Sequence, residues 1–214
     1  MRIIGITGGV GAGKSTVLAY LEKKHGAFVI QADEVGHIVM EPGQECYGPV
    51  IELFGKEVIK SDKTIDRKQV SDVVFGQPEF LNRLNGIIHP AVKRYILKSL
   101  EEQREKGCKL CVVEAALFLE EHYQDFCDEV WYIHTDEEIR IQRLMENRGY
   151  TRDKSLGIIG NQASEEYFRA HTDYVIENNG DLEKTWRQID EGVRRKKFIS
   201  QSTGKYEDEY ITGL

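Results

Sequence analysis

The stretch GITGGVGAGKST at residues 5–16 constrains the fold more than any other part of this 214-residue chain. Its first nine residues include five glycines, and glycine loses more backbone entropy on folding than any other residue. Residues 8–15 fit the pattern G-x-x-x-x-G-K-[ST], and they follow an apolar stretch, RIIGIT, and open a helical pattern. In that setting backbone N–H groups surround phosphate oxygens, so the sequence predicts a phosphate-binding loop.

Two other nucleotide-binding proteins compete with this interpretation, a dinucleotide-binding fold and a GTPase. A lysine here reaches the β- and γ-phosphates of a nucleotide, and the hydroxyl that follows it binds Mg²⁺. A dinucleotide-binding fold would use Asp33, about twenty residues further on, to hold a ribose. However, the loop contains no G-x-G-x-x-G, and that fold leaves Lys14 unexplained. A GTPase would need the guanine-binding motif N-K-x-D, which the sequence lacks.

Short apolar stretches alternate with helical patterns along the rest of the chain. This alternation favours a parallel sheet with helices on both faces, that is, an α/β fold. Helices are expected at 14–24, ended by Gly26, and at 182–199. The expected strands are residues 2–7, 27–33, 109–115, 128–135 and 173–179. Ligands of such folds lie at the carboxyl ends of the strands, where the glycine loop, Asp33 and Glu114 fall.

Composition narrows the classes of function. The net charge of −7 argues against broad nucleic-acid binding, which normally needs a basic surface. The sequence contains no run of about 18 apolar residues, so it predicts no membrane-spanning helix. The apolar start of the chain is too short and too rich in glycine for a signal peptide. Together with four cysteines, this favours reduced thiols and a cytoplasmic location.

Two acidic residues at strand ends each allow two interpretations. Asp33 would either cap the helix expected from Glu34 or act as a general base toward an acceptor hydroxyl. Glu114 ends the segment VVE, where it would either hold Mg²⁺, directly or through water, or be an ordinary surface or capping carboxylate.

Basic residues gather in EEIRIQRLMENRGYTR. Arg140 and Arg143 lie near one face at helical spacing, and Arg148 follows them. The simpler interpretation for each of them is a solvated helix face. A mobile basic segment would instead suit a kinase lid, because it neutralises the phosphate in transfer.

Two further patterns are less specific. Cys108-x-x-Cys111 offers two thiols, but a structural zinc site needs four ligands and no second pair has suitable spacing. His89-Pro90 predicts a helix break at the proline, with an incidental histidine.

Seven stretches together resemble the dephospho-CoA kinases, which belong to the P-loop kinases. The resemblance runs from Ile3 to about Val193, most of the chain, and the later stretches are far more specific than the glycine loop. They are GITGGVGAGKST, QADEVGH at 31–37, IDRKQVSDVVF at 65–75, LNGIIHPAV at 84–92, VVEAALFLE at 112–120, IQRLMENRG at 141–149 and DYVIENNG at 173–180.

The resemblance implies an activity and roles for individual residues. The family transfers the γ-phosphoryl group of ATP to the ribose 3′-hydroxyl of dephospho-CoA, which gives coenzyme A. Asp33 would be the base facing that hydroxyl, Arg143 the lid arginine, and His89 part of the substrate site. Lys14 would act on the phosphates in transfer, with Ser15 and Glu114 as candidate Mg²⁺ ligands. The ATP phosphates would be held by Gly11, Ala12, Gly13, Lys14, Ser15 and Thr16.

The resemblance also implies an architecture: a three-layer P-loop NTPase fold with a five-stranded parallel sheet. One domain is expected over 1–200, with a polar tail at 201–214. Its parts would be a core of 1–33, 108–135 and 173–200, a helical substrate-binding region of 34–107 and a lid of 136–172. Two rivals remain: a kinase of the same superfamily that acts on a nucleoside or nucleotide, and a non-catalytic nucleotide switch.

Overall fold

The structure is a computed structural model that describes residues 1–195. Its strands form one parallel sheet in the order β2-β3-β1-β4-β5. They are β1 (Arg2–Thr7), β2 (Phe28–Gln31), β3 (Leu110–Glu114), β4 (Glu129–His134) and β5 (Tyr174–Glu177). The expected five-stranded parallel sheet is confirmed, and every strand after β1 is one or two residues shorter at each end than the sequence predicted.

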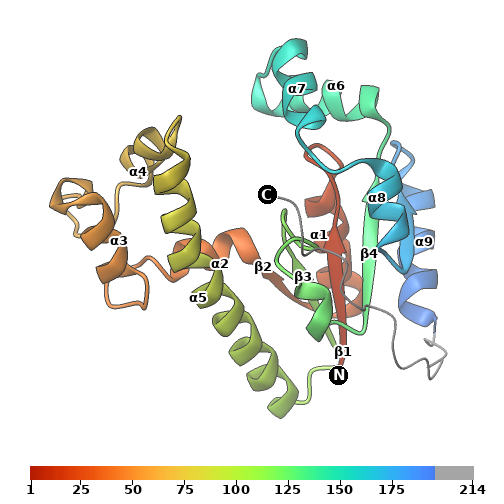
Figure 1. Ribbon diagram of the computed structural model, residues 1–214. Coiled ribbons are helices and arrows are strands. Elements are labelled where there is room, and N and C mark those ends of the chain that lie inside the picture. Colours follow the sequence, from red (N-terminus) through yellow and green to blue (C-terminus); the bar gives the residue numbers. More distant parts are fainter. Residues whose placement is uncertain (196–214) are drawn as a thin grey trace, which may run out of the picture.

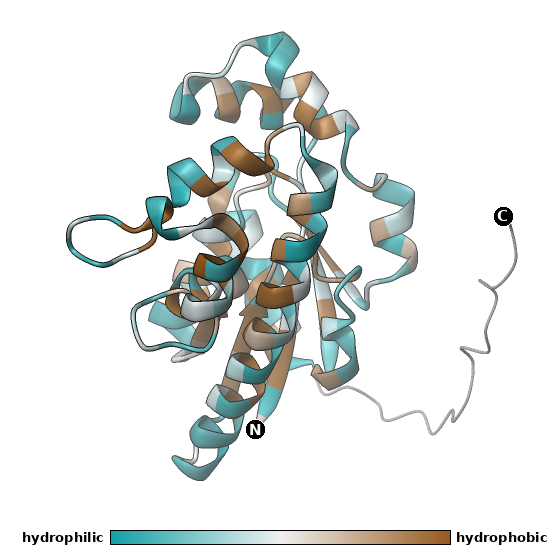
Figure 2. Ribbon diagram, turned by 60° about the vertical axis from the view of Figure 1, so that its left-hand side comes forward, coloured by the Kyte–Doolittle hydropathy of each residue, from teal (hydrophilic) through white to brown (hydrophobic). Residues whose placement is uncertain are grey.

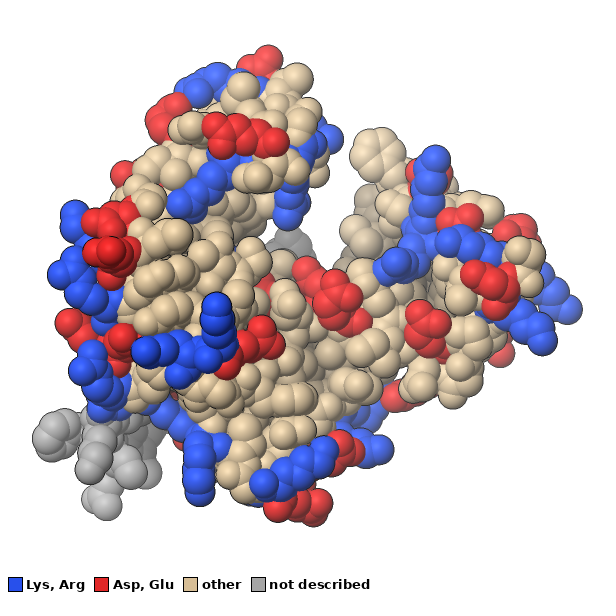
Figure 3. All heavy atoms as spheres, turned by 180° about the vertical axis from the view of Figure 1, so that it is seen from behind, with Lys and Arg blue, Asp and Glu red and all other residues tan. Residues whose placement is uncertain are grey.

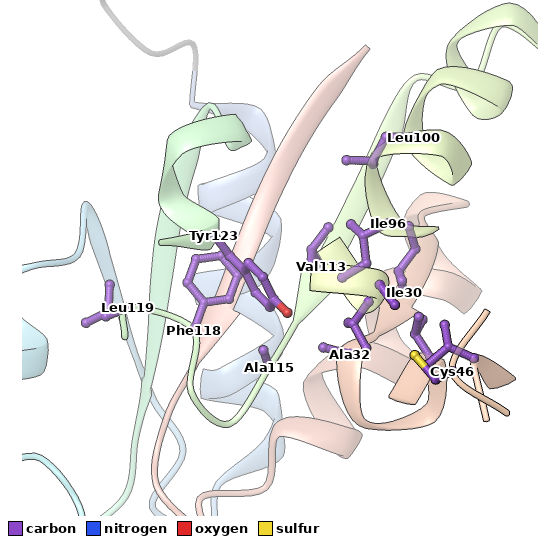
Figure 4. Packing of buried hydrophobic residues seen from close by; sticks show 14 of the residues in the cluster. Ile30, Ala32, Cys46, Ile96, Leu100, Val113, Ala115, Phe118, Leu119 and Tyr123 are labelled. Carbon is purple, nitrogen blue, oxygen red and sulfur yellow. The ribbon is translucent and has the colours of Figure 1, made fainter. Parts of the chain in front are cut away.

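Helices cover both faces of this sheet (Figure 1). On one face, α1 (Lys14–His25) and α9 (Leu182–Arg194) pack on alternate strand residues such as Ile4 and Ile6. On the other face, α5 (Pro78–Glu105) packs against Ile30 and Val113 (Figure 4). The apolar strands lie at the centre, and the helices turn polar residues outward (Figure 2). This is the expected three-layer arrangement.

Between β2 and β3 the chain is helical, as expected for 34–107. Besides α5, this helical region contains α2 (Ala32–Ile38), α3 (Tyr47–Phe54), the 3₁₀ turn η1 (Lys56–Val58) and α4 (Arg67–Val74). Figure 1 shows it standing out to one side of the sheet.

Two local predictions in this region were wrong. The helix does not break at Pro90, because α5 continues through it from Pro78 to Glu105. Asp33 is not a helix cap, because α2 already begins at Ala32 with Gln31 as its N-cap. Asp33 instead lies in the first turn of α2, where a carboxylate is favoured by the helix dipole. The capping interpretation of Asp33 is therefore excluded.

The segment 136–172 folds into three short helices above the sheet: α6 (Glu137–Arg148), α7 (Arg152–Gly160) and α8 (Glu165–Ala170). The side chains of Thr151 and Ser164 cap α7 and α8 by accepting backbone N–H groups. A small core of Ile141, Leu144 and Ile159 packs around Val10 of the glycine loop. The segment is thus attached directly to the phosphate-binding loop.

The last helix is shorter than expected. α9 ends at Arg194, and Arg195 has left the helical conformation. The remaining residues of the expected helix, 196–199, and the tail at 201–214 lie outside the described residues. Within residues 1–195, no helix combines the length and the apolar character that crossing a bilayer requires.

Candidate functional site

The glycine loop joins β1 to α1 and leaves its backbone open to a ligand. Gly13 is the N-cap of α1 and has a φ of 84°, a left-handed conformation that favours glycine. The first N–H groups of a helix lack the usual partners within it, and the helix dipole adds positive partial charge there, so the start of α1 favours an anion. The ammonium of Lys14 folds back and donates to the carbonyl of Gly8 over 2.8 Å.

A cavity of about 710 Å³ opens over this loop at the carboxyl ends of the strands. It brings together Lys14 from the loop, Asp33 from α2, Glu114 from the end of β3 and Arg143 from α6. Seen from behind, the molecule is hollowed between the segment above the sheet and the helical region, with acidic side chains at the floor (Figure 3). The residues expected to bind ATP line the same cavity, except Ala12, which is buried behind it.

Glu114 is a buried carboxyl beside a cation. It is 6% exposed, and its Oε1 lies 3.6 Å from the Lys14 ammonium. Burial raises the pKa of the Glu114 carboxyl, Lys14 opposes this shift, and the charge of Asp33 adds to it. A surface or ordinary capping role for Glu114 is therefore excluded.

The arginines of α6 are not a solvated helix face. Arg143 donates to the carbonyl of Asn178 over 2.8 Å and to the carbonyls of Gly11 and Ala12 over 3.4 and 3.3 Å. Burial lowers the pKa of Arg143, a group that stays protonated at any physiological pH. Only Arg148 is exposed, and it lines the rim of the cavity.

Arg140 and Gln162 hold the loop at a single residue, Val10. Arg140 donates from Nε to the Val10 carbonyl over 2.9 Å and from a terminal nitrogen to Gln162 Oε1 over 2.6 Å. The same Gln162 oxygen accepts the backbone N–H of Val10 over 3.0 Å. Helical spacing singled out Arg140, but sequence reasoning gave no role to Gln162, which stands far from the loop in the chain.

Asn178 is a second residue that sequence reasoning left without a role. It is 2% exposed, and its side-chain nitrogen donates to the Ala12 carbonyl over 2.8 Å. Its own carbonyl accepts from Arg143 and from the Thr135 hydroxyl. The segment DYVIENNG carried this residue, and its repeated asparagines after a strand are the signal that could have identified it.

A second cavity, of about 480 Å³, lies between the helical region and the sheet. It is lined by His89 of α5 and also by Asp33, which borders both cavities. The Nδ1 of His89 lies 2.6 Å from a carboxylate oxygen of Glu121. The two cavities therefore meet at Asp33, and His89 is not an incidental histidine on an outer face.

The oxygen donors over the loop suit a hard divalent cation. Ser15 supplies a hydroxyl and Glu114 a carboxylate, and both border the larger cavity. Mg²⁺ in nucleotide sites is typically held by one or two protein oxygens together with phosphates and water. Among the described residues, no group of three histidine, cysteine or acidic side chains could hold a metal ion without such help. Ser15 and Glu114 thus fit Mg²⁺ that arrives with a nucleotide.

Comparisons with known proteins show the family to which the chain is similar. A family model described as dephospho-CoA kinase matches residues 2–184. A dephospho-CoA kinase from Shouchella clausii is 35% identical over 186 residues, which cover 87% of this chain and 94% of the relative. One from Dehalococcoides mccartyi is 39% identical over 179 residues, covering 84% and 89%.

Solved structures share the fold. A crystal structure of a Thermus thermophilus protein superposes with a TM-score of 0.76 at 29% identity, covering 90% of this chain and 95% of that one. A Campylobacter jejuni dephospho-CoA kinase gives 0.69 at 22% identity, covering 90% and 96%. The expected P-loop fold is confirmed.

Proposed function

This chain belongs to the dephospho-CoA kinase family, and we propose that it transfers the γ-phosphoryl group of ATP to the ribose 3′-hydroxyl of dephospho-CoA. The products are ADP and coenzyme A. The observation that carries this proposal beyond the family match is the position of Asp33. Its side chain borders the cavity over the phosphate-binding loop and the neighbouring cavity that contains His89. A base for a transfer between two substrates must lie where their sites meet.

The larger cavity is the proposed ATP site. The loop from Gly11 to Thr16 presents backbone N–H groups to the phosphates, and Lys14 turns from the Gly8 carbonyl toward them. Ser15 and Glu114 would hold Mg²⁺, which neutralises charge on the β- and γ-phosphates when bound. Ala12 supports the loop from behind, because its carbonyl accepts hydrogen bonds from Asn178 and Arg143.

The smaller cavity is the proposed site for dephospho-CoA. His89 and Glu121 form a pair on its wall and offer a hydrogen bond to a polar substrate group. The helical region of 34–107 supplies half of the residues that line this cavity, which supports its role as the substrate-binding region. The segment 136–172 borders the ATP cavity instead, through Arg143, Arg148 and Gln162, and takes the role of a lid.

The reaction needs one proton transfer and one displacement. Asp33 accepts the proton of the 3′-hydroxyl while the oxygen forms a bond to the γ-phosphorus. The bond from that phosphorus to the bridging oxygen breaks, and ADP leaves. Arg143 contributes fixed positive charge at the loop, and Lys14 does so at the phosphates in transfer. Most of the rate then comes from positioning and electrostatic stabilisation.

We also place the reaction in the cytoplasm. All four cysteines are free thiols in the structure, as a reducing compartment favours.

A product assay tests the proposal. The chain is incubated with Mg-ATP and dephospho-CoA, ADP release is followed, and the phosphorylated carbon of the product is assigned by NMR. We expect stoichiometric ADP and coenzyme A with phosphate on the ribose 3′-oxygen. A parallel panel of nucleosides and nucleotides addresses the rival kinase. Faster turnover of a panel member, or nucleotide binding without any acceptor phosphorylation, would overturn the proposal.

A further inference from the structure

Two sulfur atoms lie close to the Sγ of Cys111 at the amino end of β3, away from the phosphate-binding loop. The Sγ of Cys111 lies 3.3 Å from the Sδ of Met1 and 3.9 Å from the Sγ of Cys108. Both cysteines are free thiols. Glu114 lies three residues along the same strand, about 10 Å from Cys111 at the usual rise of a strand. The proposed phosphoryl transfer uses none of these sulfur atoms.

The sheet fixes this cluster. Cys111 pairs with Ile3 of β1 and Phe28 of β2, so it sits between two neighbouring strands and is fully buried. Met1 comes just before β1 and is therefore carried beside Cys111. Cys108 stands in the turn between α5 and β3, and both it and Met1 are partly buried against the same core. The three donors come from two segments whose relative position follows from strand pairing.

The donors are soft, and their spacing suits one metal ion. Thiolates and thioethers select ions of the copper(I) class, whereas structural zinc takes four ligands. Metal–sulfur bonds of about 2.3 Å would space three trigonal sulfurs about 4 Å apart. The two cysteine sulfurs already have this spacing at 3.9 Å, and the Met1 sulfur lies 3.3 Å from Cys111 on a flexible side chain that can turn toward a shared ion. We propose that Met1, Cys108 and Cys111 form a three-sulfur site for one thiophilic monovalent cation, copper(I).

Binding at this site exchanges protons for the metal, without oxidation or reduction. Each cysteine thiol loses its proton and forms a metal–sulfur bond, while the thioether donates a lone pair. Burial, aided by Cys108, raises the pKa of the Cys111 thiol to about 12, and the positive charge of Arg104 works against this shift. A disulfide would use the two cysteines but would leave the contact of Met1 unexplained.

A competition titration tests the site on the full chain. The reduced protein competes anaerobically with bicinchoninate, a coloured chelator, for copper(I). We expect one tightly held copper(I) per chain, and affinity at least about tenfold weaker in Cys108→Ser, since even indirect supports of a metal ligand contribute about that much. Cys46→Ala is the control, because Cys46 lies in the helical region beside the Ile87 carbonyl. X-ray absorption of the wild-type complex should show sulfur neighbours only.

Several results would overturn the proposal. One is equal copper(I) affinity in wild type and Cys108→Ser, and another is nitrogen or oxygen neighbours in the absorption spectrum. A third is failure of the reduced wild-type protein to retain copper(I). If glutathione disulfide then oxidises Cys108 and Cys111 to a disulfide, the pair forms a redox site and not a metal site. Circular dichroism and the copper-free kinase activity of Cys108→Ser with Mg-ATP show whether that variant folds. If it does not, the wild-type spectrum alone decides. The site does not depend on the proposed phosphoryl transfer, so the two can fail separately.

Discussion

The ammonium of Lys14 lies 3.6 Å from the carboxylate of Glu114, so the loop lysine and the acid at the end of β3 form an ion pair on the floor of the phosphate cavity. Burial raises the pKa of Glu114, although the charge of Lys14 opposes this shift. The protein therefore holds a partly desolvated carboxylate beside the place where Mg²⁺ and phosphates would enter. A ligand that brings both phosphates and Mg²⁺ can then pair its phosphates with Lys14 and its metal ion with Glu114.

Replacing Glu114 by glutamine should separate function from stability. Turnover should fall by about 10-fold or more, because the carboxylate proposed to hold Mg²⁺ is lost. The nucleotide-free variant should melt at a higher temperature than wild type near pH 7. A carboxyl whose folded pKa is raised stabilises the protein below its unfolded pKa, and this contribution is lost as the pH rises through the folded value. Thermal melts at pH 4 and pH 7 measure this contribution. The difference in melting temperature between the variant and wild type should disappear at pH 4. A variant that melts below wild type at pH 7 contradicts the pKa shift.

Arg143→Ala should lower kcat by about 10² while weakening ATP binding much less, since fixed charge at the loop acts most on the transition state. Kinetics with varied ATP, together with nucleotide titration calorimetry, separate the two effects. Arg152→Ala is the matched control, because Arg152 also lies in the lid but pairs with Glu138 in solvent. An equal loss of affinity and turnover would make Arg143 a simple anchor.

Gly9 and Arg140 should depend on each other. A Cβ added to Gly9 would meet the guanidinium of Arg140, the group that holds the Val10 carbonyl and Gln162. Gly9→Ala therefore should raise the KM for ATP by displacing that guanidinium, and Arg140→Ala should raise it by a similar factor. The double variant should be little worse than either single one, since both remove the same interaction. Additive losses in this double-mutant cycle would show that Gly9 acts independently of Arg140.

Asn178→Ala should lower the free energy of unfolding by about 1–3 kcal/mol, because it leaves the buried Ala12 carbonyl with fewer donors. Urea denaturation of the nucleotide-free protein measures the difference. Asn178→Asp should lose more, since a carboxylate would face that carbonyl. Asn147→Ala, on the exposed side of α6, is the control. Unchanged stability in Asn178→Ala would show that the loop does not depend on this side chain.

Much of the fold was predictable because its signals are local. The spacing of glycines before Lys14 marks a turn between a strand and a helix, and strands with continuous apolar runs such as Leu110–Glu114 are typical of a buried parallel sheet. The bounds of β1 and the end of α1 before Gly26 agree with the sequence prediction. The same local signals misled at Pro90, because the packing of α5 against the sheet outweighs one missing hydrogen bond.

The site was predictable only in part, since its supports come from distant segments. Asp33 and Glu114 could be placed at strand ends, where parallel strands bring ligand-binding residues together. Gln162 and Asn178 could not, because each is tied to the loop by contacts across more than 150 positions of sequence. The positive charge of Arg143 predicted a role in a lid. Its hydrogen bonds to the loop carbonyls could not be predicted, because they depend on the fold.

The most direct test of the account is the turnover of Asp33→Asn. This variant keeps the size of the side chain but cannot accept the 3′-hydroxyl proton, so kcat should fall by about 10² or more while ATP affinity stays near wild type. Glu52→Gln removes one exposed carboxylate from α3 of the helical region and should leave kcat unchanged. If Asp33→Asn turns over dephospho-CoA at the wild-type rate, Asp33 is not the base and the central claim is wrong.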